Sequence, residues 1–268
     1  MPTKLYAVPS RPVAREAVIL AAGLGSRLNG HEIPKPLRTV GGRPLLHRTL
    51  SVLEEAGIER VHVVVGYRAD EIVAATRRFE GLSVGVDFIH NVEWNLSNGV
   101  SVLCAAPHVK GPFLLTMSDH VLSPGMVHAM ARVSPPEGGV VLAVDPDLGS
   151  IFDMDDATKV CTDGHRIAAI GKDLTTYDCI DTGLFSCTGG LFDALAAERA
   201  ARGDCSLSDG MRRLGRADLA LVHPIGRDDF WQDVDTPETA AYAEVVLAAS
   251  RALPLAEEHR AWTRVAAL

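Results

Sequence analysis

The sequence predicts an α/β fold: a three-layer, Rossmann-like architecture in which a mostly parallel sheet carries helices on both faces. Apolar runs of strand length alternate with helical segments through the first half of the 268-residue chain, and this alternation implies parallel strands joined by right-handed crossovers. The first apolar run leads directly into a glycine-rich turn. In the second half, two short runs around an Asp-Gly dipeptide indicate a smaller β-hairpin elaboration.

The elements of the first half follow from the hydrophobic pattern. Residues 16–22 are almost continuously apolar, which is typical of a strand that is covered on both faces. Residues 44–56 have the pattern of an amphipathic helix that ends at Gly57. The same reasoning predicts further strands at 60–67, 84–91 and 113–121, and further helices at 69–79 and 98–106.

The pattern changes after about residue 139. Residues 158–171 should form a hairpin that turns at Asp163-Gly164, because this dipeptide tolerates positive φ. Strands at 140–146, 178–188, 219–225 and 230–236, and helices at 189–215 and from Pro237 onward, complete the predicted set. We expect a loose leader over 1–15, one folded domain over 16–251, and a tail over 252–268 that packs on the domain or joins two copies into a homodimer.

The composition limits the partners and the compartment. A formal net charge of -8 provides no cationic field along the chain, which argues against a nucleic-acid polymer or an anionic membrane as partner. The five cysteines are odd in number, well spread and without a C-x-x-C pair, which favours reduced thiols. No run approaches 18 apolar residues and the first residues lack a signal-peptide pattern, so we expect a cytoplasmic protein without membrane insertion.

A glycine loop follows the first predicted strand. The segment AAGLGSR ends at Arg27, and PKPL begins seven residues later and contains Lys35. Glycines after a strand allow backbone N–H groups to approach a phosphate closely. Leu28 stands where a dinucleotide-binding fingerprint needs a third glycine, and the G-K-[ST] of a P-loop is missing. The alternative is a tight turn with a solvated Arg and Lys.

These motifs resemble those of a known enzyme family. LAAGLGSR followed by PKPL is similar to the nucleotidyltransferases that make nucleoside-diphosphate sugars and alcohols. The ordered segments TMSDHV, DATKV, IGKDL, DCIDTGLF and WQDVDT resemble a narrower branch, the inositol-1-phosphate cytidylyltransferases, over residues 16–250. That branch is often fused to a membrane domain that uses its product, and this sequence shows no such segment. Phosphocholine and phosphonate cytidylyltransferases share the first and last motifs and remain alternatives.

The resemblance implies a nucleotide site at the loop. The loop would wrap the triphosphate, the arginine would steady it and the lysine would face the reacting phosphates. The pyrimidine would lie near the loop, near Gly66 and near the segment NLSNGVS, where Asn98 could instead cap a helix. The implied nucleotide-binding residues are Leu20, Ala21, Ala22, Gly23, Gly25, Ser26, Arg27, Lys35, Gly66, Asn98, Gly99, Ser101 and Asp119.

Three acids are predicted to hold Mg²⁺, the expected cofactor. Asp119 follows the fourth predicted strand, at the sheet edge where open parallel sheets bind ligands. Asp233 and Asp235 are two residues apart, so on a strand both side chains point to one face. Magnesium in such enzymes binds one or two carboxylates together with phosphate oxygens. Alternatively, Asp119 caps a turn, and Asp235 lies in the N-cap region of the last helix.

The hairpin is expected to bind an anionic acceptor. Lys159 and Lys172 lie on its two arms, and a lysine suits a phosphate monoester, although solvated hairpins also carry lysines routinely. Asp181 and Thr182 interrupt an apolar strand and could bind acceptor hydroxyls, since a buried aspartate needs a partner. His120 joins this set as a neighbour of Asp119.

The resulting prediction is a cytidylyltransferase. A phosphate oxygen of a small phosphorylated or phosphonate acceptor, foremost 1L-myo-inositol 1-phosphate, attacks the α-phosphorus of CTP and gives a CDP-alcohol and pyrophosphate. Catalysis would rest on positioning and charge neutralisation by Arg27, Lys35, Lys159 and Lys172. Lys35→Ala should lower turnover far more than it disturbs folding, because a lysine in a glycine loop should contribute little to the core. A nucleotide-sensing subunit without transfer activity is the alternative.

Overall fold

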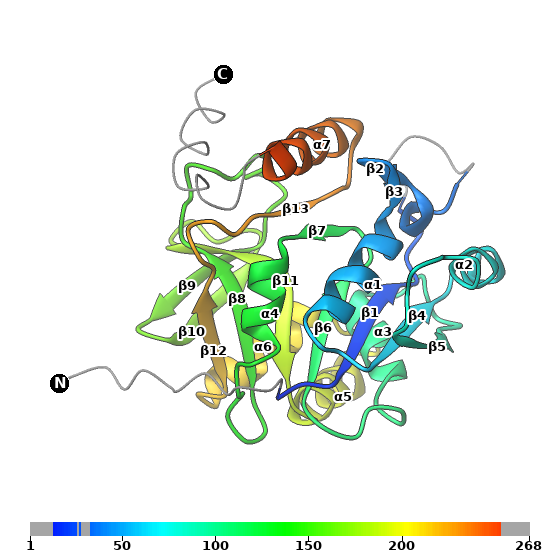
Figure 1. The fold of residues 1–268 in the computed structure, drawn as a ribbon. Coiled ribbons are helices and arrows are strands. Elements are labelled where there is room, and N and C mark those ends of the chain that lie inside the picture. The colour runs from blue at the N-terminus through cyan, green and yellow to red at the C-terminus, as the bar shows by residue number, and fades with distance from the viewer. Residues whose placement is uncertain (1–12, 26, 28–32, 253–268) are drawn as a thin grey trace.

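A nine-stranded sheet forms the centre of the protein (Figure 1). The computed structural model describes residues 13–25, 27 and 33–252, so nearly all of the expected leader and tail lie outside the described residues, and the domain division stays a prediction. The strands of the sheet are β1 (Glu16–Ala21), β4 (Arg60–Val65), β5 (Gly85–His90), β6 (Phe113–Met117), β8 (Val140–Asp145), β9 (Lys159–Asp163), β10 (Arg166–Gly171), β11 (Cys179–Cys187) and β12 (Ala220–Pro224). Their spatial order is β5-β4-β1-β6-β11-β8-β12-β10-β9.

The first half of the sheet is parallel, as predicted. β1 lies between β4 and β6, and β4 continues to β5. The predicted strand 113–121 is wrong in one respect, because the chain turns at residues 118–119 and starts a separate strand, β7 (His120–Leu122). β7 pairs with β13 (Trp231–Asp233) instead of with the main sheet. This turn places Asp119 just beyond the carboxyl end of β6.

The second half of the sheet is mainly antiparallel, which corrects the prediction of a mostly parallel sheet. Only β8 and β12 pair in parallel there. β11 is antiparallel to β6, β8 and β9, and β10 is antiparallel to β9 and β12. The predicted hairpin is β9 and β10, and β9 also pairs with β11. The five strands β11, β8, β12, β10 and β9 therefore close into a ring of pairings.

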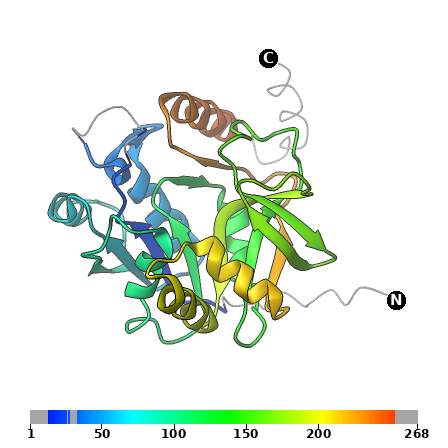
Figure 2. The ribbon, with the colours of Figure 1, turned by 180° about the vertical axis from the view of Figure 1, so that it is seen from behind.

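Helices cover both faces of the sheet. On one face lie α1 (Leu45–Glu55), α2 (Ala69–Thr76) and α4 (Pro124–Met130), and on the other α3 (Asn98–Cys104), α5 (Gly190–Arg202) and α6 (Leu207–Arg216). Figure 2 shows α5 and α6 on the side opposite to α1 and α4. Side chains of β1 alternate between the two hydrophobic clusters: Val18 and Leu20 enter one, and Ile19 enters the other. This alternation explains why the strand is apolar at nearly every position.

Two helices differ from the prediction. The segment 189–215 is split, because Gly203 ends α5 in the left-handed conformation, at φ 79°, and Ser206 begins α6 with a capping box to Asp209. Helix α4 was not predicted, although Ser123-Pro124 is a common helix start and the Ser123 hydroxyl accepts a hydrogen bond from the Met126 N–H.

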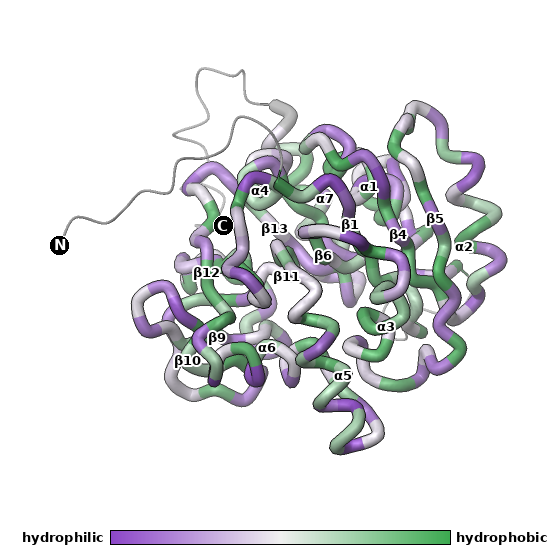
Figure 3. Tube along the Cα trace, turned by 90° about the horizontal axis from the view of Figure 1, so that it is seen from below, coloured by the Kyte–Doolittle hydropathy of each residue, from purple (hydrophilic) through white to green (hydrophobic). Residues whose placement is uncertain are grey.

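Smaller elements surround one edge of the sheet. They are the 3-10 turn η1 (Lys35–Leu37), β2 (Thr39–Val40), β3 (Arg43–Pro44) and α7 (Pro237–Ala252). A third hydrophobic cluster, with Val40, Val121, Val234 and Leu247, packs α7 on the β2-β3 and β7-β13 pairs. Hydropathy colouring shows hydrophobic segments along the central strands and more hydrophilic ones in the outer loops (Figure 3). In the part of the chain described, no helix combines the length and the apolar character that crossing a membrane requires.

Candidate active site

The glycine loop runs from the carboxyl end of β1 to η1. Gly25 has φ 62°, and a Cβ atom there would lie 2.7 Å from the Lys35 Cβ and 2.9 Å from its Cδ. Glycine at this position therefore lets the Lys35 side chain pass beneath the loop. The expected loop residue Ser26 lies outside the described residues.

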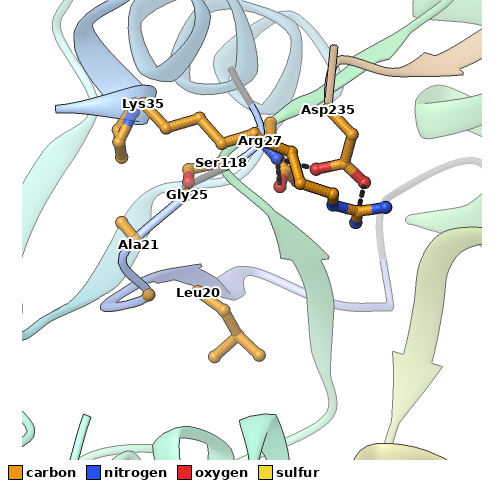
Figure 4. Close-up of a pocket in the computed structure, with 10 residues that line it drawn as sticks. Leu20, Ala21, Gly25, Arg27, Lys35, Ser118 and Asp235 are labelled. Atoms are coloured by element: carbon orange, nitrogen blue, oxygen red, sulfur yellow. Dashed lines mark hydrogen bonds and ion pairs between the residues drawn. The ribbon is translucent and has the colours of Figure 1, made fainter. Parts of the chain in front are cut away.

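A pocket of about 320 Å³ opens beside this loop, at the carboxyl ends of β1 and β6. Figure 4 shows Arg27 and Lys35 both reaching Asp235 across it. Its lining residues are Leu20, Ala21, Gly23, Gly25, Arg27, Lys35, Pro36, Ser118, Asp119 and Asp235. Eight of these were predicted as site residues, and Pro36 and Ser118 are additional. The edge at which it lies is the one where open α/β sheets bind ligands.

Ion pairs connect the two loop cations to acids from distant segments. The Lys35 Nζ donates to Asp119 Oδ2 at 2.5 Å and also to Asp235 Oδ1. The Arg27 guanidinium donates to Asp235 Oδ2 at 2.8 Å and to Asp156 Oδ2 at 2.9 Å. Asp119 follows β6, Asp156 precedes β9 and Asp235 follows β13. Three separate parts of the chain therefore converge on the loop.

Lys35 and Asp119 hold each other in the charged state. Burial alone would lower the pKa of Lys35, but the charges of Asp119 and Asp235 outweigh it and raise this pKa. Burial alone would raise the pKa of Asp119, but Lys35 and the hydrogen bond from His120 bring it well below its usual range. Lys35 is only 9% exposed. This burial contradicts the premise that the lysine contributes little to the core. We therefore expect its removal to destabilise the fold as well, because two acids would lose their cation.

His120 lies behind Asp119. Its Nδ1 is 2.8 Å from Asp119 Oδ1, and burial, which would lower the pKa of His120, is outweighed by this hydrogen bond and by the charge of Asp119. Its ring packs on β11 so closely that a Cβ atom at Gly183 would lie 2.4 Å from Nε2. His120 is therefore held between β11 and the Asp119 carboxylate, while a direct contact with an acceptor stays a prediction.

Three carboxylates lie close enough to hold one metal ion. Oxygen atoms of Asp156, Asp233 and Asp235 lie within 4.8 Å of one another. Three carboxylates from two loops and a strand end are a donor set that suits a hard divalent cation such as Mg²⁺. Burial and the nearby charges of Asp235 and Asp119 raise the pKa of Asp233, and they outweigh the opposite effects of His120 and Lys35. Asp119 lies next to this group, bound to Lys35 and His120.

The predicted acceptor residues are two lysines of the hairpin region and two residues of β11. The Lys172 Nζ binds Asp156 Oδ1 at 2.7 Å, and the buried Lys159 donates to the Asp155 carbonyl at 3.2 Å. The Asp181 carboxylate accepts from the Gly183 N–H at 2.8 Å, and burial raises the pKa of Asp181 to about 6. Thr182 is fully buried, and its hydroxyl donates to the Ala143 carbonyl on β8. The structure therefore gives Thr182 a bond between strands, contrary to the expected bond to an acceptor hydroxyl.

The segment expected near the base makes contacts within the protein. The Asn98 Oδ1 accepts from the Leu207 N–H at 2.8 Å, so this side chain joins α3 to α6, and the N-cap of α3 is Ser97. The alternative of Asn98 as a cap is therefore wrong. The buried Ser101 hydroxyl accepts from Asn91 Nδ2 at 2.9 Å, and a Cβ atom at Gly99 would lie 2.5 Å from the Cys205 carbonyl. Their contact with a nucleotide stays a prediction.

Gly66 lies beside the glycine loop. A Cβ atom there would lie 3.0 Å from the Ala22 carbonyl and 2.4 Å from the Trp94 Cβ, and the neighbouring Tyr67 N–H donates to that carbonyl at 2.9 Å. The turn after β4 and the start of the loop are therefore packed against each other, as the predicted nucleotide site requires.

The comparison with known proteins agrees with this geometry. The model of the MobA-like NTP transferase domain matches residues 17–263. The chain belongs to this family. The predicted resemblance to nucleotidyltransferases is thus confirmed, and so is the predicted enzyme class.

Individual relatives of this NTP transferase are similar over most of its length. It is 38% identical over 242 residues to the bifunctional IPC transferase and DIPP synthase of Rubrobacter xylanophilus, an alignment that covers 87% of this chain and 53% of that protein. It is 30% identical to the 2-aminoethylphosphonate cytidylyltransferase of Lancefieldella rimae, over 81% of this chain and 78% of that one. The chain spans about half the length of the IPC transferase and DIPP synthase relatives it matches.

A solved structure supports the same relationship. The inositol-1-phosphate CTP transferase from T. maritima superposes on this NTP transferase with a TM-score of 0.76 at 26% identity, covering 91% of this chain and 99% of that one. The mixed α/β nucleotidyltransferase fold is thereby established.

Asp156 is the charged residue of the site that sequence reasoning did not single out, although it opens the quoted segment DATKV.

Proposed function

We propose that this NTP transferase is a cytidylyltransferase that transfers CMP from CTP to the phosphate of inositol 1-phosphate, giving a CDP-alcohol and pyrophosphate. The observation that carries the proposal is the convergence of two sets of cations at one group of acids. Arg27 and Lys35 come from the glycine loop, and Lys172 comes from the end of the β9–β10 hairpin. Two anionic substrates that react with each other need cations arranged in this way.

The reaction needs no nucleophile from the protein. An oxygen of the acceptor phosphate attacks the α-phosphorus of CTP and forms a new P–O bond. The bond from the α-phosphorus to the oxygen that bridges to the β-phosphorus breaks, and pyrophosphate leaves with the electron pair. Arg27 and Lys35 offset the charge that develops on the leaving group and on the transferred phosphoryl group.

Further residues bind and orient the substrates. Asp233 and Asp235, which lie in one carboxylate group with Asp156, are assigned to hold Mg²⁺ together with the neighbouring Asp119. Mg²⁺ would offset phosphate charge when bound. Lys172 binds the acceptor phosphate, and Asp181, on β11, accepts a hydrogen bond from an acceptor hydroxyl. In this assignment the hairpin is the acceptor-binding elaboration of the fold. The names of the relatives, which include an inositol-1-phosphate CTP transferase, support the choice of base and acceptor.

A phosphonate acceptor is the second candidate, because one relative is named a 2-aminoethylphosphonate cytidylyltransferase. Such an acceptor carries an ammonium group, which the ionised Asp181 would bind as an ion pair. Inositol presents neutral hydroxyls to the same carboxylate. The two candidate acceptors therefore differ in the group that contacts Asp181, which is a charged ammonium in one and a neutral hydroxyl in the other.

A pyrophosphate-release assay tests the proposal. The protein is mixed with Mg²⁺, one of CTP, UTP, GTP or ATP, and one acceptor from inositol 1-phosphate, phosphocholine, glycerol phosphate, 2-hydroxyethylphosphonate and 2-aminoethylphosphonate. We expect release with CTP and inositol 1-phosphate, and a diphosphate product in the phosphorus NMR spectrum. Faster release with another acceptor or another nucleotide would replace the assignment. No release with any pair would favour the nucleotide-sensing alternative.

A cytoplasmic location goes with this function. All five cysteines of the chain are free thiols in the structure, which suits a reducing compartment. Fractionation of the source cells followed by immunodetection tests this assignment, and the homodimer stays a prediction that light scattering of the purified protein tests.

A further inference from the structure

One carboxylate joins the two halves of the site. The Asp156 Oδ2 accepts from Arg27 of the glycine loop at 2.9 Å, and its Oδ1 accepts from Lys172 of the hairpin at 2.7 Å. The side chains of Arg27 and Lys172 are 51% and 52% exposed, while that of Asp156 is 25% exposed. The two most exposed cations of the site thus share one partly buried anion.

Two contacts hold the loop that carries Asp156: a ring contact at Phe152 and a hydrogen bond that closes the turn from Asp153 to Ala157. Phe152 stacks on Tyr242 of α7, with ring centroids 4.4 Å apart and an interplanar angle of 13°. The buried Ala157 donates its N–H to the Asp153 carbonyl at 3.1 Å. Asp156 therefore lies on a hydrogen-bonded turn, whereas Arg27 and Lys172 reach it through long, rotatable side chains.

A carboxylate and a phosphate are recognised in the same way. Both accept charge-assisted hydrogen bonds from guanidinium and ammonium groups, and a guanidinium can exchange one for the other without changing its own geometry. The function proposed above assigns Arg27 to the nucleotide phosphates and Lys172 to the acceptor phosphate. Asp156 thus makes, with both cations, the same kind of contact that the substrate phosphates would make.

We propose that Asp156 is a positioning residue that stands in for substrate phosphate. In the protein without substrates it keeps Arg27 and Lys172 directed at the reaction centre, and it gives up these contacts when the triphosphate and the acceptor phosphate bind. This inference rests on the proposed transfer reaction and goes beyond it, because it assigns a role to a residue that the proposed reaction does not use.

The proposal predicts opposite effects on binding and on turnover. Asp156→Asn keeps the size of the side chain and removes the competing charge, so both cations become available to phosphates. Breaking one exposed ion pair of this kind corresponds to an affinity gain of roughly twofold to fivefold. The freed side chains are no longer held in one orientation, so kcat should fall while KM for CTP falls as well. A purely structural role would raise KM or leave it unchanged.

The binding test uses pyrophosphate as probe, in the presence of a chelator so that no metal takes part. Isothermal titration compares the unsubstituted protein with Asp156→Asn and with the matched control Asp155→Asn, in which the neighbouring exposed aspartate loses the same charge. We expect tighter pyrophosphate binding for Asp156→Asn, no comparable gain for Asp155→Asn, and loss of the gain when Arg27→Gln is combined with Asp156→Asn.

Three results would overturn the proposal. Weaker or unchanged pyrophosphate binding without metal would show that Asp156 acts only as a metal ligand or a structural residue. An equal gain in Asp155→Asn would reduce the effect to general charge. If Asp156→Asn still tightened pyrophosphate binding in the Arg27→Gln background, Arg27 would not be exchanging Asp156 for phosphate. Pyrophosphate is a product of any such NTP transfer. This test therefore stays valid if the CTP or inositol assignment fails, and its own failure can be told apart from theirs.

Discussion

Replacing Asp181 by asparagine is expected to stabilise the folded protein at pH 7 by about 3 kcal/mol. Burial raises the pKa of Asp181 from 3.8 to about 6, and each unit of such a shift corresponds to about 1.4 kcal/mol. Asparagine has nearly the same shape and retains a carbonyl oxygen for the Gly183 N–H. The substitution therefore removes the buried charge and keeps the hydrogen bond.

The sign of the pH dependence follows from the two pKa values. Below the unfolded value of 3.8, Asp181 is protonated in both states and the difference between variant and parent should vanish. As the pH rises through 3.8 the unfolded chain ionises first, and the folded state loses relative stability until the pH exceeds about 6. The stabilisation by Asp181→Asn should therefore grow between these pH values and then stay constant.

Urea denaturation at several pH values between about 4 and 7 measures this difference. Equal slopes for parent and variant would allow their midpoints to be compared directly. Asp155→Asn is the control, because it makes the same substitution at an exposed position. A destabilised variant at pH 7, or a difference that does not change with pH, would refute the account of Asp181 as a buried carboxylate with an unfavourable charge.

Four further predictions follow from the same structure. Lys35→Met should lower turnover at least about a hundredfold and destabilise the fold by about 3–5 kcal/mol, measured by steady-state kinetics and urea melts; retained turnover would contradict its role. Gly25→Ala should weaken CTP binding more than Gly23→Ala in a titration, because only Gly25 has positive φ and a Cβ clash; equal effects would count against it. Burial lowers the pKa of His62, so stability should fall as the pH drops below about 6.5, and His62→Leu should show a flatter profile of urea midpoints; parallel profiles would exclude this. Asp233→Asn should raise the Mg²⁺ concentration needed for half-maximal activity, and an unchanged requirement would remove it from the metal site.

The centre of the site could be predicted because it follows from local patterns and one rule of sheet geometry. Glycines after a buried strand indicate the loop, and the carboxyl ends of parallel strands lie at one edge. These grounds placed the loop and Asp119 at one edge, and the resemblance assigned Arg27 and Lys35 to the phosphates and Asp235 to the metal. The structure joins these four residues by ion pairs. The resemblance to nucleotidyltransferases added the chemistry that such a loop serves.

Other features depend on contacts that a local pattern does not contain. Asp156 reaches the site because β9 pairs with β11 as well as with β10, and no periodicity signals this closure. Thr182 was grouped with Asp181, although neighbouring strand residues point to opposite faces, and the structure directs its hydroxyl to β8. Asparagine is a common helix-capping residue, but α6 lies close enough for its Leu207 N–H to donate to the Asn98 side chain.

The nine-residue strand β11 limits how the protein can change shape. Its last residues, Phe185 to Cys187, pair with β6 of the parallel half of the sheet, and its first residues, Cys179 and Ile180, pair with β9 of the hairpin. The ladder of β11 is irregular between Asp181 and Phe185, where Gly183 has φ 75°, so a swing of one half against the other would have to bend the strand at this point. The irregularity adjoins Asp181, so a bend there would move the hairpin and this carboxylate relative to the glycine loop.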